Sequence, residues 1–272
     1  MTESVVGRPV WAELFTEGAP RAREFYTGLL GWGSTEPSEE FGGYSNFTRG
    51  EGWIAGLMEN TIDPSLPASW TVYLHTDDIS ALAKRAEAAG ATTIVEPAQV
   101  GELGWFAQFV DPSGAVVGAW QPGAHQGFAA VQEIGAPYWF ELHAAAGYDA
   151  VLPFYREVFG WRTATMSDTP EFRYTQMLGV EGDPDDVRAG VMDASMWEGA
   201  RSAWQVYWMV EDTDAAFAHA VAAGATEVHP PHDTPYGRLA VLRDPCGAEF
   251  RRSEEHTSEL QSPMYLVCRL LL

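Results

Sequence analysis

Two glutamates occupy matching places in two similar stretches of the sequence, and both are candidates for acid–base chemistry. Glu13 lies in "PVWAELF" (9–15) and Glu141 lies in "PYWFELH" (137–143). Alternate residues of a strand share a face, so each glutamate shares a face with the tryptophan two positions before it. Aromatic surroundings raise the pKa of a carboxyl group toward values that suit a general acid or base. The alternative is a structural carboxylate that is hydrogen-bonded to a neighbouring strand or to a tyrosine.

Two histidines lie on strand-like segments close to these glutamates. His75 ends "WTVYLH" and His143 follows Glu141 by two positions. An imidazole at such a place serves as a base or as an anchor for a ligand, since its pKa lies near neutrality. The alternative is a structural histidine with satisfied hydrogen bonds. The two histidines do not occupy equivalent positions of the two stretches.

The glutamate stretches belong to an internal repeat that covers most of the chain. "FYTGLLGW" (25–32) returns as "FYREVFGW" (154–161). "FVDPSGAVVGAW" (109–120) returns in the same order as "VLRDPCGAEFRR" (241–252). Several matches in register indicate a duplicated domain.

The length of 272 residues is enough for two hydrophobic cores, one for each copy of the repeat. We expect a first domain over 1–122, a linker of small and polar residues over 123–136 and a second domain over 137–252. Residues 253–272 have no counterpart in the first half. They resemble the translation of a sequencing adapter, so we expect them to be foreign to the natural protein; the alternative is a genuine C-terminal helix.

Each half divides again into two units that begin with a strand and a helix. In the first half, "VWAELFT" (10–16) alternates as a strand does, and the helical pattern that follows is closed by Gly31. "WTVYLHT" (70–76) starts the second unit, whose helical pattern is closed by Gly90. Further strands and a "DPSG" turn complete it. The pattern predicts an α+β fold of four βαβββ modules, which form two domains with open, curled sheets.

With four such modules, paired "FY…GW" helix ends and paired "DP-x-GA" turns, the chain resembles the vicinal-oxygen-chelate (VOC) superfamily. This superfamily includes glyoxalase I, extradiol dioxygenases and the fosfomycin and bleomycin resistance proteins. The resemblance covers about residues 1–252 and is greatest to the two-domain actinobacterial glyoxalase-like branch. It implies two modules per domain that curl around a cleft, in which four strand positions hold a divalent metal ion.

The resemblance allows these four positions to be tested for metal ligands. In the first half they fall on Trp11, Gly56, Thr71 and Gly118. In the second half they fall on Trp139, Gly190, Gln205 and Arg251. Only Gln205 carries a possible donor. A shift of two residues keeps the face and would bring in Glu13, or Glu141 with Glu249. We therefore expect no metal ion and no other cofactor; a recruited divalent metal is the alternative.

The faces that would carry a metal in the superfamily are rich in aromatic residues here. Glycine at these positions is expected to leave room for a flat or apolar ligand. We expect the following residues to bind it: Trp11, Phe15, Tyr73, His75, Trp120, Trp139, His143, Gln205, Tyr207 and Glu249.

Charge and composition exclude several partners. The formal net charge of −22 would repel nucleic acid and anionic lipid surfaces. The first residues do not resemble a secretion signal and no stretch has the length and apolarity of a membrane span, so we expect a cytoplasmic protein. A small molecule is the expected partner, and a homodimer is left open.

Three functions compete. The first is a VOC protein that binds a small, partly apolar or aromatic molecule without a metal ion. The second is a lyase, isomerase or oxygenase of that superfamily, with Glu13 or Glu141 as base or with a recruited metal. The third is an interaction protein whose modules only present a surface. The missing metal ligands and the aromatic strands favour the first.

Overall fold

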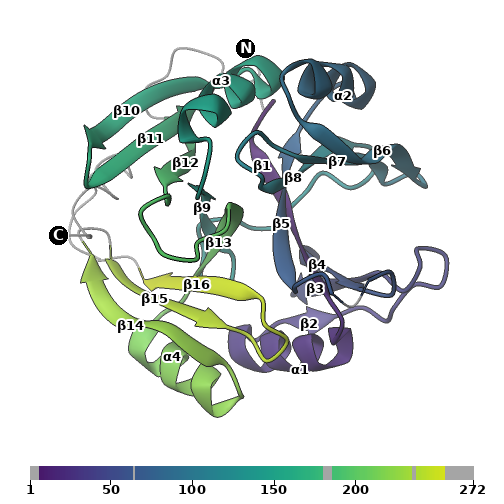
Figure 1. Cartoon of the computed structure of the whole chain (residues 1–272). Coiled ribbons are helices and arrows are strands. Elements are labelled where there is room, and N and C mark those ends of the chain that lie inside the picture. The colour runs from purple at the N-terminus through teal and green to yellow at the C-terminus, as the bar shows by residue number, and fades with distance from the viewer. Residues whose placement is uncertain (1–5, 64, 180–185, 235–236, 255–272) are drawn as a thin grey trace.

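The computed structural model describes residues 6–63, 65–179, 186–234 and 237–254. Its described part forms two eight-stranded mixed sheets and four helices (Figure 1). Each sheet is built from one half of the chain and contains two βαβββ modules. The predicted α+β fold with two VOC-like domains is confirmed.

The first sheet has the strand order β2-β3-β4-β1-β5-β8-β7-β6, with β1 and β5 paired antiparallel at its centre. Its strands are β1 (Pro9–Thr16), β2 (Gly33–Ser34), β3 (Ser45–Arg49), β4 (Gly52–Glu59), β5 (Ser69–His75), β6 (Thr92–Val100), β7 (Gly104–Val110) and β8 (Val116–Pro122).

The second sheet repeats this topology as β10-β11-β12-β9-β13-β16-β15-β14. Its strands are β9 (Pro137–Ala144), β10 (Arg162–Thr169), β11 (Phe172–Leu178), β12 (Val187–Asp193), β13 (Ala203–Met209), β14 (Thr226–Thr234), β15 (Gly237–Arg243) and β16 (Glu249–Glu254).

The helices begin and end at residues that the sequence marks. They are α1 (Ala19–Leu30), α2 (Ile79–Ala88), α3 (Tyr148–Phe159) and α4 (Thr213–Ala222). Gly31 ends α1 in the left-handed conformation at φ 66°, which a residue with a Cβ adopts only at a cost. Asp78 caps α2 by accepting from the Ala81 N–H at 2.9 Å, and Asp212 caps α4 in the same way.

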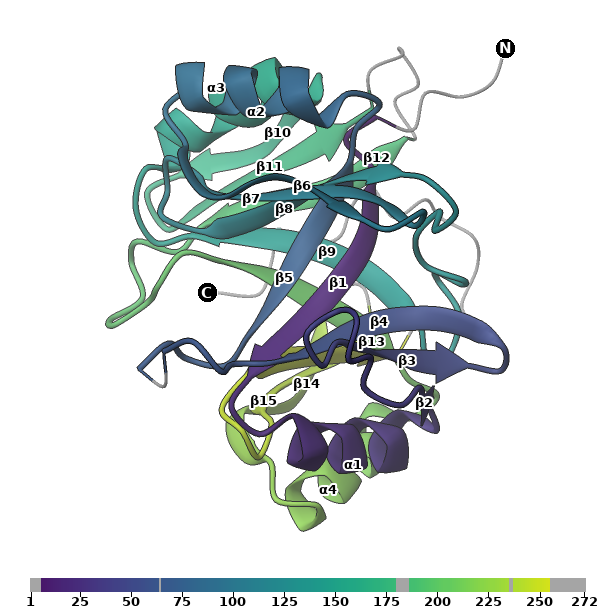
Figure 2. The same ribbon diagram turned by 90° about the vertical axis from the view of Figure 1, so that its right-hand side faces the viewer.

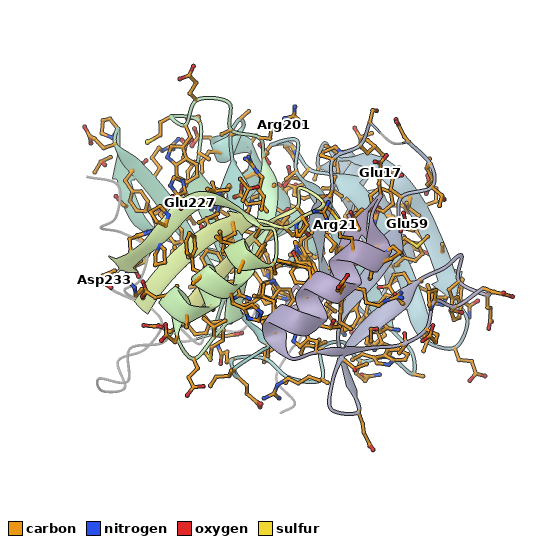
Figure 3. All side chains as sticks on the ribbon, turned by 90° about the horizontal axis from the view of Figure 1, so that it is seen from below. Glu17, Arg21, Glu59, Arg201, Glu227 and Asp233 are labelled. Carbon is orange, nitrogen blue, oxygen red and sulfur yellow. The ribbon has the colours of Figure 1, made fainter. Side chains whose placement is uncertain are left out.

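Helices from different halves lie side by side at the two ends of the molecule. Figure 2 shows α2 with α3 at one end and α1 with α4 at the other. Figure 3 looks onto the pair of α1 and α4, with Arg21 and Glu59 near the start of α1. The Glu59 carboxylate accepts from the Ala19 N–H at 2.8 Å and so satisfies a donor of the first turn of α1. The two halves thus share both helical layers.

The repeated tyrosine of the "FY…GW" helix end explains how the halves dock. Tyr26 of α1 donates to the Asp244 carboxylate of the second half's "DP" turn at 3.0 Å, and it accepts from Trp70 Nε1 at 3.1 Å. In the second half, Tyr155 makes the equivalent hydrogen bonds: it donates to the Asp111 carboxylate at 2.9 Å and accepts from Trp204 Nε1 at 2.8 Å. Each half therefore buries its helix-end tyrosine against a turn of the other, within one continuous hydrophobic core.

The segment that joins the halves packs against the first sheet. The Phe128 N–H donates to the Val10 carbonyl at 2.8 Å, and the Phe128 ring lies 5.6 Å from the Trp11 ring. At the other end of the second half, β16 continues to Glu254, two residues past the boundary expected at residue 252. The rest of the expected foreign tail, 255–272, lies outside the described residues. In the described part of the chain, no helix is both long and apolar enough to cross a bilayer.

Candidate functional site

The pairing of strands in the first half places Glu13 at the centre of the sheet. Glu13 of β1 lies opposite Gly56 of β4, and Tyr73 of β5 lies opposite Gly118 of β8. The residues opposite the two glycines are therefore Glu13 and Tyr73, each two positions from the residue predicted by spacing, Trp11 and Thr71. The face is unchanged, because a two-residue shift along a strand keeps the side chains on the same side.

Tyrosine rings fill the space over the glycines. A Cβ at Gly56 would lie 1.8 Å from the Tyr44 hydroxyl oxygen, and a Cβ at Gly118 would lie 2.2 Å from the Tyr73 ring. The prediction that these glycines leave room for a ligand is therefore wrong. Glycine is required at both positions because an aromatic ring lies where a side chain would project.

A chain of hydrogen bonds from both sides converges on the Glu13 carboxyl group. Trp11 Nε1 donates to the Tyr44 hydroxyl at 3.0 Å, and Tyr44 is hydrogen-bonded to Glu13. On the other side, Gln108 Nε2 donates to the Tyr73 hydroxyl at 2.6 Å, and Tyr73 donates to Glu13 Oε1 at 3.3 Å. We name Trp11, Glu13, Tyr44, Tyr73 and Gln108 the Glu13 cluster.

Burial raises the pKa of Glu13 to about 7, although the hydrogen bonds from Tyr44 and Tyr73 lower it in part. The cause is desolvation, which disfavours the charged carboxylate. The Glu13 side chain is half-buried, as are Tyr44 and Gln108, whereas Tyr73 is only 3% exposed. The Glu13 cluster is therefore partly open to solvent and holds a carboxyl group that exchanges its proton near neutral pH.

The second half repeats the same arrangement around Glu141. Glu141 lies opposite Gly190, and a Cβ at Gly190 would lie 1.8 Å from the Tyr174 hydroxyl oxygen. Tyr174 donates to Glu141 Oε2 at 3.0 Å and Tyr207 donates to Glu141 Oε1 at 2.9 Å. A glutamate between two tyrosines is thus common to both halves.

Two substitutions distinguish the second cluster from the first. Strand pairing places His143 where the first half has Phe15, and Arg251 where the first half has Gly118. His143 Nε2 lies 2.6 Å from Glu141 Oε1, and Arg251 Nη2 lies 3.3 Å from His143 Nδ1. Arg251 also donates to Glu249 at 3.0 Å. We name Glu141, His143, Tyr174, Tyr207, Glu249 and Arg251 the Glu141 cluster.

The Glu141 cluster fixes the charge of its carboxylate. Desolvation alone would raise the pKa of Glu141, but hydrogen bonding to His143 and the charge of Arg251 lower it below the ordinary value. Desolvation and the Arg251 charge lower the pKa of His143. Since arginine only donates, His143 accepts at Nδ1 and donates from Nε2 to Glu141. The lowered pKa keeps this carboxylate ionised at neutral pH, and at 1% exposure it is closed off from solvent.

The remaining residues that were expected to bind a ligand lie on the same strands as the two clusters or on neighbouring strands. Trp120 joins Trp11 through His125, whose ring lies 4.6 Å from Trp11 and 5.5 Å from Trp120. Burial lowers the pKa of His125 to about 4, so it is neutral at pH 7. Phe15 and His75 lie at opposite ends of the first sheet's central strands. Phe15 pairs with Ser69, and His75 pairs with Trp120. In the second half, Gln205 lies opposite Glu141, and Trp139 lies opposite Tyr207.

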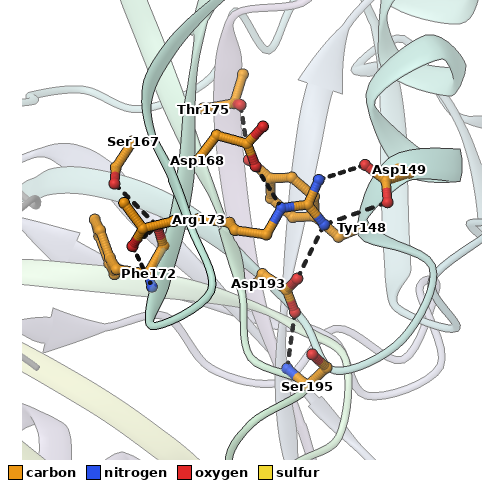
Figure 4. A network of polar contacts seen from close by, with 10 residues as sticks. Tyr148, Asp149, Ser167, Asp168, Phe172, Arg173, Thr175, Asp193 and Ser195 are labelled. Carbon is orange, nitrogen blue, oxygen red and sulfur yellow. Dashed lines mark hydrogen bonds and ion pairs between the residues drawn. The ribbon is translucent and has the colours of Figure 1, made fainter.

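A further charged group lies at the rim of the second sheet (Figure 4). Arg173 binds Asp149 at 2.6 Å, Asp168 at 2.7 Å and Asp193 at 3.3 Å, and its guanidinium lies over the Tyr148 ring. The three carboxylates come from α3, β10 and β12, so the group ties a helix start to two strands. The Asp149 and Asp168 side chains are solvent-exposed, so their ion pairs contribute little to stability individually, whereas Asp193 is partly buried.

The residues at the superfamily's metal positions do not fit a metal ion. The first half offers one carboxylate, one tyrosine and two glycines, and tyrosine rings occupy the space between them. In the second half, Arg251 brings a positive charge to the corresponding place. Within the described ranges, no group of three or more His, Cys, Asp or Glu side chains is placed to hold a metal.

The sequence pointed to Tyr73 and Tyr207 as site residues, whereas Tyr44, Tyr174 and Gln108 were not among the predicted catalytic or binding residues. Tyr44 and Tyr174 open the repeated stretches "YSNF" and "YTQM", so the repeat contained a signal for them. Gln108 carried no such signal, since Val241 takes its place opposite Arg251 in the second half. Gln108 is recognisable only once β7 is known to pair with β8.

Comparisons with known proteins agree with this architecture. Residues 8–118 match the family model for the glyoxalase/bleomycin resistance protein/dioxygenase superfamily, and residues 140–252 match the model for a glyoxalase-like domain. The chain is 35% identical over 264 residues to the "Anthracycline biosynthesis protein DnrV" of Streptomyces peucetius, which covers 92% of this chain and 94% of the relative. It is 34% identical over 249 residues to the "Putative glyoxylase CFP32" of Mycobacterium bovis, with 90% and 93% covered.

Solved structures with little sequence similarity share the fold. The Mn(II)-bound glyoxalase from Novosphingobium aromaticivorans matches with a TM-score of 0.62 at 15% identity, over 93% of this chain and 83% of that one. The 2,3-dioxygenase LapB from Pseudomonas sp. KL28 matches with a TM-score of 0.62 at 15% identity, over 95% and 97%.

Proposed function

The chain belongs to the glyoxalase/bleomycin resistance protein/dioxygenase superfamily, and from that premise we propose that it binds a small, partly aromatic molecule in the cleft of its first half without a metal ion. The observation that carries the proposal is the partly accessible Glu13 cluster, which holds an exchangeable carboxyl group beside the rings of Trp11, Tyr44 and Tyr73.

The apolar surface beside Glu13 is separate from the main core. Trp11, Tyr73 and Trp120 form a small cluster of their own, against which Phe106 and Leu103 pack while remaining partly exposed. Aromatic walls with a few polar groups are typical of small-molecule sites. Such a surface favours a flat, apolar molecule that places one polar group at Glu13.

The donor set supports binding without a metal. Glu13 is held by two phenols, and those phenols occupy the space that a metal and its ligands would need. The name of the relative DnrV supports an aromatic ligand, since anthracyclines carry a flat, hydroxylated ring system.

Calorimetric titration of protein treated with EDTA, using a soluble anthraquinone sulfonate as a flat probe, tests this function. We expect saturable one-site binding that added Zn²⁺ or Mn²⁺ does not strengthen. Phe106→Ala is expected to weaken binding about tenfold, because about 1.4 kcal/mol of apolar contact is lost. Leu239→Ala is the matched control, since Leu239 lies at the equivalent half-buried position of β15. Absence of binding, or binding only with metal, would contradict the proposal.

The second candidate is a glyoxalase-like lyase, which the name of the relative CFP32 and the proton-exchanging Glu13 favour. In that case Glu13 would act as the base at a carbon next to a carbonyl group. Turnover of the methylglyoxal–glutathione hemithioacetal, lost in Glu13→Gln, would support it. Binding of the anthraquinone probe without turnover would support the first function.

A further inference from the structure

The two halves hold the same group of one glutamate and two tyrosines, so their differences show what each half can do. Both glutamates lie opposite a glycine, and both accept hydrogen bonds from a tyrosine of the central strand. The differences that matter here are the exposure of the carboxyl group and the charged side chains beside it. They decide which half can offer its carboxyl group to a ligand.

Three hydrogen-bonding side chains already engage the Glu141 carboxylate. It accepts from Tyr174, Tyr207 and His143, and it is 1% exposed. The Trp197 ring lies 5.2 Å from the His143 ring and packs edge-on against it. Arg251 supplies the balancing positive charge. A ligand would have to displace a hydrogen-bonded partner to reach this carboxylate, which is costly for a buried charge.

The Glu13 carboxyl group has the opposite character. No basic side chain is among its partners, and Phe15 lies where the second half has its histidine. Its two phenol partners each accept from an upstream N–H, of Trp11 and of Gln108, so their own O–H groups point to Glu13. When Glu13 is protonated, its acidic hydrogen needs an acceptor beyond these donors. The Glu13 side chain is half-buried, so part of it remains accessible for such an acceptor.

We propose, on the basis of the function proposed above, that the cleft of the first half selects ligands with a phenolic or enolic hydroxyl group, which pairs with Glu13, and that the Glu141 cluster is a structural counterpart that binds no ligand. The ionised Glu13 accepts the hydrogen bond of the ligand hydroxyl. The protonated Glu13 donates to the ligand oxygen. A hydroxyl group is therefore accommodated in both states, whereas an ether oxygen is accommodated only in the protonated state.

Three probes that differ at one position test this selection: anthraquinone, 2-hydroxyanthraquinone and 2-methoxyanthraquinone, titrated by fluorescence quenching into the full chain. At about pH 8, where Glu13 is ionised, the neutral form of the hydroxy probe, whose fraction is measured from its absorption spectrum, is expected to bind at least about tenfold more tightly than the methoxy probe, the effect of one hydrogen bond to a charged group. Below about pH 6 the difference is expected to shrink to less than about threefold.

In Glu13→Gln, the ratio of the affinities for the hydroxy and methoxy probes is expected to be independent of pH, while unsubstituted anthraquinone still binds. Glu141→Gln is the matched control and leaves the wild-type pH dependence in place. If Glu141→Gln does not fold, Glu249→Gln, which removes a contact of Arg251 at a half-exposed position, replaces it.

The outcomes separate the two proposals. Binding of anthraquinone without selection for the hydroxyl group, or selection that survives in Glu13→Gln, overturns this inference and leaves the proposed function standing. Loss of selection in Glu141→Gln overturns the assignment of the two halves. If none of the probes binds, the proposed function fails and the inference fails with it.

Discussion

The pKa values of Glu13 and Glu141 are shifted in opposite directions, although each carboxyl group lies between two tyrosines. The difference comes from Phe15 and Gly118 in the first half, where the second half has His143 and Arg251. Without a histidine donor or an arginine, desolvation prevails and the pKa of Glu13 is raised to about 7. With both, the pKa of Glu141 is lowered. Two side chains therefore decide whether the same group can exchange a proton.

Phe15→His tests this explanation. An imidazole at position 15 would donate to Glu13 as His143 donates to Glu141, so the pKa of Glu13 is expected to fall by about one unit or more. Carbon-13 NMR titration of the glutamate side-chain carboxyls measures it, with Glu13→Gln providing the assignment. Phe15→Leu is the control that leaves the pKa near 7. An unchanged pKa in Phe15→His contradicts the explanation.

The two glutamates are also expected to have opposite effects on the pH dependence of stability. The pKa of Glu13 is raised on folding, so the folded protein binds more protons than the unfolded chain, and stability falls as pH rises from about 4.5 through about 7. The loss is at most about 3 kcal/mol, and less for a half-buried group. Glu13→Gln is expected to remove this loss, measured by urea unfolding at about pH 5 and about pH 8.

Glu141→Gln provides the comparison of opposite sign. The pKa of Glu141 is lowered on folding, so its contribution is present above the unfolded pKa and is lost as pH falls through the folded pKa. This variant is therefore expected to lose about the same stability at about pH 5 and about pH 8, and less as the pH falls below 4.5, the ordinary pKa of a glutamate. Equal losses for both variants at both pH values would contradict the assigned charges.

At the scale of elements, the close approach of tyrosine rings to β4 and β12 depends on glycine. Gly56→Ala and Gly190→Ala are each expected to cost about 1–3 kcal/mol, because the new methyl group overlaps a tyrosine hydroxyl. Thermal unfolding measures the loss, and Tyr44→Ala is expected to relieve it in the Gly56→Ala background. Gly28→Ala in α1 is the control, where no atom lies within 4 Å of the new Cβ and helix propensity favours alanine. A neutral Gly56→Ala would contradict the packing.

The elements themselves could be predicted from the sequence, whereas the pairing of strands could not. Gly31 and Gly90 mark where two helices stop, and alternation marks β1 and β5, because these signals are local. Spacing along the chain placed Trp11 and Thr71 beside the glycines, two residues from the observed partners. Alternation could not reveal this, because a shift of two residues leaves the same side chains on the same face of the strand. Glu13 and Tyr73 were expected in the cleft, but their pairing with Gly56 and Gly118 required the strands to be aligned.

For the whole molecule, the hydrogen bonds from a tyrosine of each half to an aspartate of the other half predict that the two halves unfold together. Tyr26 and Tyr155 each join an aspartate of the other half within one core. Tyr26→Phe and Tyr155→Phe are each expected to cost about 1–3 kcal/mol, because a buried indole N–H loses its acceptor. Calorimetry is expected to show one transition in both variants. Two separate transitions in the wild-type protein would contradict a shared core.

The two halves form the same sheet, but of the two glutamates that lie between tyrosines only Glu13, in the first half, is half-buried rather than fully buried. The crystal structure of EDTA-treated protein soaked with 2-hydroxyanthraquinone tests this most directly. We expect the ring system in the first-half cleft, with its hydroxyl oxygen about 2.5–3.0 Å from a carboxyl oxygen of Glu13. A ring system bound at the Glu141 cluster, or a metal ion coordinated by Glu13, would contradict the account.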